Sequence, residues 1–166
     1  MQIPRLESRR LILREYRQGD LEVFAALNGN PAARARMGGP LTRDEAAERF
    51  RDFIGRERGN APEVWAVTRR QGGDYVGHCW LTLPKGASAP EVGFIVEPKL
   101  WNQGYGTEIA VTLLHYSVSC RKLPRVVATV DAEHEACIKV LERAGMKRQG
   151  EAKDATGVYY IYSRNR

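Results

Sequence analysis

Residues 91–117 read "EVGFIVEPKLWNQGYGTEIAVTLLHYS", a strand-like run joined to a helix-like run. The apolar stretch "EVGFIV" (91–96) predicts a strand, and one helical face then follows from Ile109, Ala110, Leu113, Leu114 and Ser117. Gly104 and Gly106 lie just before that helix. A glycine turn at such a junction leaves backbone N–H groups unpaired at the positive end of the helix dipole. The stretch therefore predicts an anion site, most naturally for phosphate, on the amides of residues 102–107.

Better-known phosphate loops do not fit this stretch. The Gly-Lys-Ser/Thr of the Walker pattern is absent, and the dinucleotide fingerprint requires a small residue where Ile109 stands. Because glycine lacks a Cβ, a bulky residue at 104 or 106 is expected to occupy the place of the phosphate. A tight turn that binds no ligand is the alternative.

The N-terminal half predicts a strand, two helices and a hairpin. "RLILREY" (10–16) reads as a strand, and Asp20 is expected to cap a helix that "NGNP" (28–31) ends. Thr42 and Glu45 have capping-box spacing before a second helix, expected to end near Gly55. Two β-rich runs, "VWAVT" (64–68) and "YVGHCWLTL" (75–83), flank the glycine turn "RRQGGD" (69–74), and the loop "PKGASAP" (84–90) follows.

The C-terminal half continues with a strand, a helix and two more strands. "RVVATV" (125–130) is apolar on both faces, as a buried strand beside a parallel neighbour would be. A helix stripe of Cys137, Val140, Leu141 and Ala144 ends at Gly145, and strands follow at 146–152 and 158–163. The order predicts a mixed α/β fold around one, mostly antiparallel sheet.

Length and composition set wide limits. The 166 residues are expected to form one domain, 1–166, and the absence of a signal-like or membrane-spanning run favours the cytoplasm. Three widely spaced cysteines, Cys79, Cys120 and Cys137, favour free thiols over a disulfide framework or a metal site. The net charge of +6 allows an acidic partner, but the arginines are scattered among carboxylates, so nucleic acid is an unlikely one.

Three blocks resemble the GNAT superfamily of N-acetyltransferases. From Val96, "VEPKLWNQGYG" follows the pattern V-x-P-x-x-W-x-x-G-x-G, which is similar to the acetyl-CoA-binding signature. "HEACIKVLERAGM" (134–146) is similar to the second conserved block, a helix that ends at a glycine before a strand. "RLILREY" and the aspartate of "GDL" resemble the start of the ribosomal-protein N-terminal acetyltransferase branch.

The resemblance implies a GNAT-like fold with a parallel, splayed strand pair, about four flanking helices, and acetyl-CoA as co-substrate. The pyrophosphate is then expected on the loop formed by Trp101, Asn102, Gln103, Gly104, Tyr105, Gly106 and Thr107. The pantetheine arm is expected to pair with the backbone of Ile95 and Val96. His134 and Cys137 replace the Asn and the Ser or Ala from which the second block contacts CoA.

Acetyl transfer to an amine requires a base, an oxyanion donor and an acid. Glu91, at a position that carries the base in some relatives, is the candidate base if burial raises its pKa; the alternative is a solvated glutamate. By resemblance, the oxyanion donor is the Val96 N–H. The usual acid tyrosine is replaced by Leu141, which leaves Cys137 and the last-strand tyrosines Tyr159, Tyr160 and Tyr162. A nucleophilic His134–Cys137 pair at i, i+3 is a further alternative, although a ping-pong route is foreign to the superfamily.

The sequence thus predicts an N-acetyltransferase for a primary amine, whether a protein N-terminus, an amino acid or small amine, or an aminoglycoside-like compound. A non-catalytic CoA-binding or regulatory module of the same fold is the alternative, and a basic nucleic-acid-binding domain is disfavoured. The two early helices and the loop 84–90 are expected to build the acceptor pocket. A monomer or homodimer, without a metal or a membrane partner, is expected.

Overall fold

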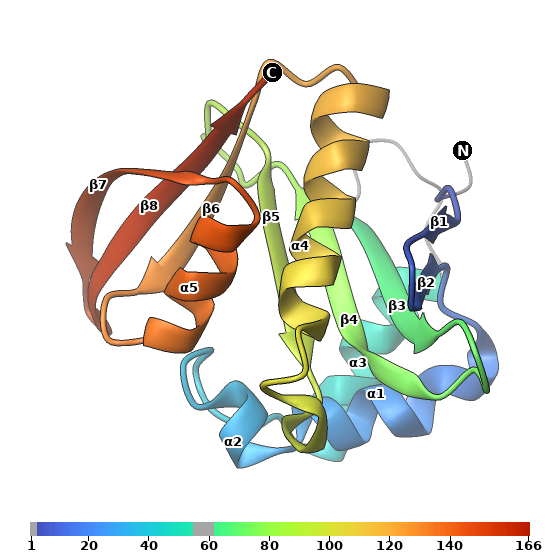
Figure 1. Ribbon diagram of the computed structural model, residues 1–166. Coiled ribbons are helices and arrows are strands. Elements are labelled where there is room, and N and C mark those ends of the chain that lie inside the picture. Colours follow the sequence, from blue (N-terminus) through green and yellow to red (C-terminus); the bar gives the residue numbers. More distant parts are fainter. Residues whose placement is uncertain (1–2, 55–61) are drawn as a thin grey trace.

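The computed structural model describes residues 3–54 and 62–166. These residues form one eight-stranded sheet in the order β1-β2-β3-β4-β5-β6-β8-β7 (Figure 1). The strands are β1 (Leu6–Glu7), β2 (Leu11–Arg14), β3 (Glu63–Arg69), β4 (Tyr75–Thr82), β5 (Glu91–Val96), β6 (Arg125–Asp131), β7 (Lys147–Asp154) and β8 (Gly157–Asn165). Neighbouring strands are antiparallel except for β5 and β6. The mixed, mostly antiparallel α/β fold expected from the sequence is confirmed.

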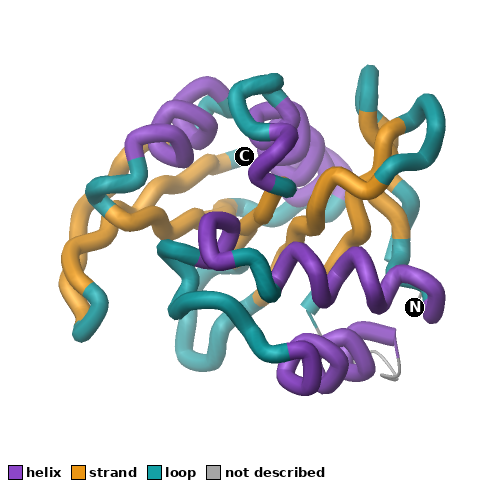
Figure 2. Tube along the Cα trace, turned by 90° about the horizontal axis from the view of Figure 1, so that it is seen from below, coloured by secondary structure: helices purple, strands orange, loops and turns teal. Residues whose placement is uncertain are grey.

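The helices cover both faces of the sheet. They are α1 (Leu21–Asn28), α2 (Pro31–Arg34), α3 (Arg43–Ile54), α4 (Tyr105–Leu114) and α5 (Glu135–Arg143). Helix α4 continues into a wider π-helical segment, His115–Cys120, and short 3-10 turns span Gln18–Asp20 and Pro98–Leu100. In both views α4 and α5 lie on one face of the sheet and α1 and α3 on the other (Figures 1 and 2).

Each face has its own hydrophobic core. The larger core joins the sheet to α4 and α5 and includes Leu13, Val67, Ile109 and Leu113. The smaller core lies under α1 and α3 and consists of Tyr16, Phe24, Ala46, Phe50, Val64 and Ala66. Burial of these apolar side chains fixes which face of each strand points to which helix layer.

The parallel pair parts almost where it begins. Only Glu91 and Val127 are bridged between β5 and β6, and the Val127 N–H donates to the Pro90 carbonyl at 2.9 Å. On their outer edges β6 is paired with β8 and β5 with β4 throughout, so beyond the bridge the two strands no longer pair with each other. The splayed pair that the resemblance implied is therefore present.

Several expected details are confirmed and others are wrong. The Glu45 carboxylate accepts from the Thr42 N–H at 2.7 Å, as the capping box requires, and Gly72 and Gly73 adopt positive φ in the hairpin turn. Asp20 occupies the N-cap position of α1 as expected, but its side chain makes no capping bond, because its carboxylate binds Arg14 and the Arg17 N–H instead. The expected helix end at Gly55 lies outside the described residues.

Several short elements were not predicted: β1, α2, the π-helical segment and the two 3-10 turns. Asn30 starts α2 by accepting hydrogen bonds from the N–H groups of Ala32 and Ala33, so "NGNP" separates two helices. Within residues 3–54 and 62–166 no helix is both long and apolar enough to cross a membrane.

Candidate functional site

Helix α4 begins at a left-handed glycine. Gly104 is the N-cap with φ +80° and makes no side-chain cap, and Asn102 is also left-handed with φ 61°. The first intrahelical bond in this turn runs from the Glu108 N–H to the Gly104 carbonyl at 3.1 Å. The N–H groups of Tyr105, Gly106 and Thr107 precede it and therefore have no acceptor within the helix. Because residues 101–104 are exposed, this end of the dipole faces solvent.

The two glycines are favoured for different reasons. A Cβ on Gly104 would lie 3.3 Å from Arg10 Nη2 on a backbone that side chains rarely adopt. Gly106 has no positive φ, and a Cβ there would lie 3.3 Å from the Phe94 ring and 3.5 Å from Val140. The expectation that a side chain at 106 would occupy the phosphate position is therefore corrected: it would meet the protein's own side chains first.

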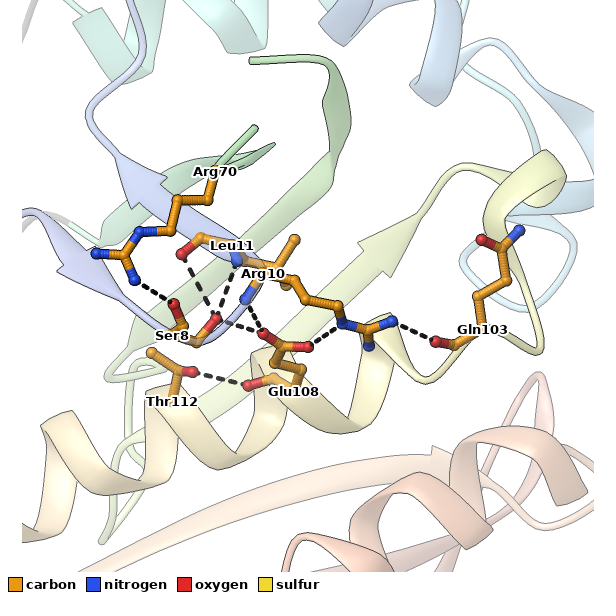
Figure 3. Close-up of polar contacts among 7 residues, drawn as sticks. All are labelled: Ser8, Arg10, Leu11, Arg70, Gln103, Glu108 and Thr112. Atoms are coloured by element: carbon orange, nitrogen blue, oxygen red, sulfur yellow. Dashed lines mark hydrogen bonds and ion pairs between the residues drawn. The ribbon is translucent and has the colours of Figure 1, made fainter. Parts of the chain in front are cut away.

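A polar network ties the first turn of α4 to the N-terminal strands (Figure 3). The Glu108 carboxylate accepts from Ser8 Oγ at 2.7 Å, from the Arg10 N–H at 2.7 Å and from Arg10 Nε at 2.6 Å. Arg10 Nη1 donates to the Gln103 carbonyl at 3.0 Å. Burial alone would raise the pKa of Glu108, but the hydrogen bonds from Ser8 and Arg10 outweigh it and lower the pKa.

The main chain of β5 offers hydrogen-bonding groups beside the splay. The Glu97 N–H donates to the Val76 carbonyl in β4, whereas the Pro90 carbonyl accepts from β6. Because main-chain polar groups alternate along a strand, the N–H and C=O groups of Phe94 and Val96 point toward the β6 side. The main-chain carbonyl of Ile95 points toward β4. A Cβ placed on Gly77 would lie 2.0 Å from that carbonyl oxygen. The structure therefore favours Phe94 with Val96, not Ile95, for backbone pairing. The Val96 carbonyl already accepts from Trp101 Nε1 at 2.8 Å, which leaves its N–H.

His134 and Cys137 lie at the start of α5. His134 is the half-buried N-cap, and burial together with Arg36 lowers its pKa against the opposing effect of Asp131. Burial raises the pKa of Cys137 to about 11, so this side chain is a thiol at neutral pH. A thiolate nucleophile activated by His134 does not fit these surroundings.

The catalytic candidates divide between the two faces of the sheet. Glu91 alternates with the core residues Val92 and Val96, so it lies on the face of α1 and α3; the Trp80 ring covers Gly93 on that same face. Tyr160 packs with the larger core on the opposite face. The structure therefore does not gather Glu91, Cys137 and Tyr160 into one cluster.

Local contacts distinguish these candidates further. Glu91 is only partly buried, so the condition set for it as a base is met only in part, and its Oε1 accepts from Thr129 Oγ1 at 2.6 Å. The Arg148 guanidinium lies 3.4 Å from the Tyr160 ring centroid. Tyr162 is buried and donates its hydroxyl to Glu142 at 2.9 Å, and Tyr159 pairs with Asp131 across the β6–β8 ladder.

Sequence reasoning missed the residues that brace the site. Arg10, Glu108 and Thr129 act through contacts between segments far apart in the chain, and no local spacing indicates them. Arg36, just after α2, similarly pairs with Asp131 at 2.9 Å at the turn into α5. The described residues bring together no group of three His, Cys, Asp or Glu side chains that could hold a metal ion.

Comparison with known proteins identifies the family. The family model described as an acetyltransferase (GNAT) domain matches residues 10–147. The uncharacterised N-acetyltransferase YnaD of Bacillus subtilis (strain 168) is 25% identical over 146 residues, which cover 87% of this chain and 84% of YnaD.

Solved structures share the fold. An acetyltransferase (GNAT family) from Bacillus anthracis superposes with a TM-score of 0.86 at 23% identity, covering 98% of both chains. The ribosomal-protein-S5-alanine acetyltransferase from Vibrio fischeri has a TM-score of 0.81 at 15% identity, covering 98% of this chain and 96% of its own. At these identities the superpositions establish the fold alone, whereas the family match spans most of the sequence. The chain therefore belongs to the GNAT family of acetyltransferases.

Proposed function

We propose that this protein transfers the acetyl group of acetyl-CoA to a primary amine, by direct attack of the amine while both substrates are bound. GNAT acetyltransferases use acetyl-CoA, and the structure offers a surface suited to it. The observation that carries the proposal is the exposed first turn of α4, where the left-handed Gly104 leaves three main-chain N–H groups free to bind an anion. A diphosphate is the anion that CoA brings to such a site.

The rest of the carrier is assigned to the splay between β5 and β6. The loop from Trp101 to Thr107 would hold the diphosphate, and the N–H groups of Phe94 and Val96 would pair with the pantetheine arm. Trp101, which is 46% exposed, braces the end of β5 through its bond to Val96. On this assignment His134 and Cys137, at the start of α5, border the same carrier-side face.

The reaction forms a C–N bond and breaks a C–S bond. The neutral amine attacks the acetyl carbonyl carbon, and a β5 N–H that faces the splay, that of Phe94 or of Val96, is the proposed donor to the developing oxyanion. Collapse expels the CoA thiolate, which takes a proton, and the nitrogen loses one to a base. An α-amine of pKa about 8 is neutral about one time in ten at pH 7, and a lysine of pKa about 10.4 far less often, so both gain from a base.

Glu91 is the proposed base, because it lies on the face opposite the proposed carrier helices and has a carboxylate oriented by Thr129. A base on the acceptor face can take the proton of the attacking amine, and an acid on the carrier face can protonate the departing thiolate. For the acid, Tyr160 is preferred to Cys137. A thiol of pKa about 11 would protonate a thiolate of ordinary pKa about 8.5 uphill by about 3 kcal/mol.

The proposed acceptor is a primary amine, which could belong to a protein N-terminus, an amino acid or a small amine. The resemblance of "RLILREY" to the ribosomal-protein branch, together with the shared fold of the Vibrio fischeri protein, favours the first of these. The acceptor face also carries the Glu91 carboxylate, whose negative charge suits a substrate that arrives as a cation.

The binding of CoA to the loop can be tested with a matched pair, Gly104→Asp and Gly104→Asn. Both residues tolerate the left-handed region comparably and place a Cβ beside Arg10, but only Asp adds a negative charge. Calorimetry with CoA should show that Gly104→Asp binds at least about tenfold more weakly than Gly104→Asn, because a carboxylate repels the diphosphate. Equal affinities for the two variants would place the diphosphate elsewhere.

A further inference from the structure

One arginine contacts three residues around the start of α4. Arg10 Nε donates to Glu108 Oε2 at 2.6 Å, and Nη1 donates to the Gln103 carbonyl at 3.0 Å (Figure 3). The same guanidinium lies 4.4 Å from the centroid of the Tyr105 ring. Arg10 therefore bridges the last loop residue before Gly104 and the first turn of helix after it.

The guanidinium is itself held in place. Glu108 also accepts from the Arg10 N–H and from Ser8 Oγ, each at 2.7 Å, and the Arg70 N–H donates to the Arg10 carbonyl at 2.8 Å. The side chains of Arg10 and Glu108 are 35% and 15% exposed. Such a charge-assisted, partly buried pair orients Arg10 more firmly than an exposed ion pair would.

The loop that Arg10 contacts depends on such support. Asn102 and Gly104 both adopt positive φ, and residues 101–104 are exposed. A short exposed segment with glycine has many alternative conformations, and ordering it during binding would cost affinity. In addition, the Glu108 carboxylate lies in the first turn of α4, where a bound diphosphate would be repelled if no cation neutralised it.

We infer that Arg10 is a positioning residue that preorganises the 103–107 loop for the CoA diphosphate. It fixes the Gln103 carbonyl, and with it the left-handed turn at Gly104, and it neutralises Glu108. This inference rests on the proposed function, because it assigns a role at the site proposed for CoA. Arg10 needs no contact with the acetyl group or the acceptor.

Arg14 supplies a matched control within the same strand region. Its Nη1 and Nη2 donate to the two Asp20 oxygens at 2.7 and 2.9 Å, and the two side chains are 20% and 14% exposed. This pair is as well ordered as Arg10–Glu108 but braces the turn before α1. Loss of either ion pair should lower the thermal midpoint of unfolding. Only loss of the Arg10–Glu108 pair should change the conformation of the 103–107 loop.

The experiment measures the dissociation constants of CoA by calorimetry and of pantetheine, which lacks the diphosphate, by amide NMR titration. Arg10→Gln should weaken CoA about tenfold and leave pantetheine within twofold. Arg10→Lys should restore only part of the CoA affinity, because its ammonium can still neutralise Glu108 but cannot present the planar fork that reaches both acceptors. Arg14→Gln should bind both ligands within twofold of the parent chain.

Three results would overturn the inference: unchanged CoA affinity in Arg10→Gln, an equal loss in Arg14→Gln, or an equal loss for pantetheine. A general loss of folding would affect both arginine variants and both ligands, so it is separated from positioning. If the parent chain fails to bind CoA, or if Gly104→Asp and Gly104→Asn bind it equally, the proposed site itself fails. Failure of the proposed site is thus distinguished from failure of the inference alone, in which the parent chain binds CoA on this loop but Arg10→Gln binds it equally well.

Discussion

Gly104 and Gly106 are identical in the sequence but not in what they do. At position 104 glycine is favoured by a backbone with φ +80°, whereas at 106 it is favoured by the closeness of Phe94 and Val140. A large residue at 106 would first disturb packing between β5, α4 and α5. Only position 104 is therefore suited to test the anion site without a change in the core.

Glu91 is the residue whose proposed catalytic role is most open to measurement. Glu91→Gln keeps the side-chain shape and an acceptor for Thr129 but removes the base. We expect amine-dependent release of the CoA thiol to slow about 100-fold, with CoA affinity unchanged, because a general base typically contributes 10²–10⁴ in rate.

Glu133→Gln is the control, since Glu133 is an exposed carboxylate at the turn before α5. It should retain the parent rate. A Glu91→Gln enzyme with the parent rate at every pH would remove Glu91 from the mechanism and leave it as a partner of Thr129.

At the scale of elements, β4 carries a buried histidine against α1. His78 stacks 5.4 Å from the Phe24 ring, and burial lowers its pKa to about 3. The folded state therefore keeps His78 neutral, while the unfolded chain, with a pKa of about 6.5, takes up a proton as the pH falls. His78 should thus cost no stability above pH 6.5 and about 2 kcal/mol at pH 5.

Urea unfolding at pH 7 and pH 5 measures this slope. His78→Phe should remove most of it, because phenylalanine fits the aromatic cluster and binds no proton. His115→Gln, which changes an exposed histidine on the π-helical segment, should leave the slope as it is. A His78→Phe protein as acid-sensitive as the parent chain would show that other groups cause the loss.

The elements also show how far the sequence predicts this fold. Strong local signals, such as the period of α4 and the Thr42–Glu45 capping box, correctly located α1, α3, α4, α5 and seven of the strands. The sequence predictions failed where contacts between residues far apart in the chain determine the local structure. Asp20 lies at the N-cap position of α1, but its carboxylate forms an ion pair with Arg14. Strand β1 forms because it pairs with β2. Arg10 and Glu108, 98 residues apart, could not be paired by any local pattern.

For the molecule as a whole, the sheet separates two kinds of surface. Helices α4 and α5 lie on the face assigned to the carrier, and α1 and α3 lie on the face assigned to the acceptor (Figure 2). The sheet opens at the splay after the Glu91–Val127 bridge. Arg36 links the segment after α2 to Asp131 at the end of β6, beside this opening. Chemistry proposed at the splay can thus draw on groups from both faces.

The most direct test of the account is an amide NMR titration of the protein with CoA and, separately, with pantetheine. CoA should shift the amide signals of residues 103–107 together with those of Phe94 and Val96. Pantetheine should shift the strand amides but not those of 103–107, because it lacks the diphosphate. Shifts by CoA that leave residues 103–107 unmoved would contradict the claim that main-chain amides at the start of α4 hold the carrier.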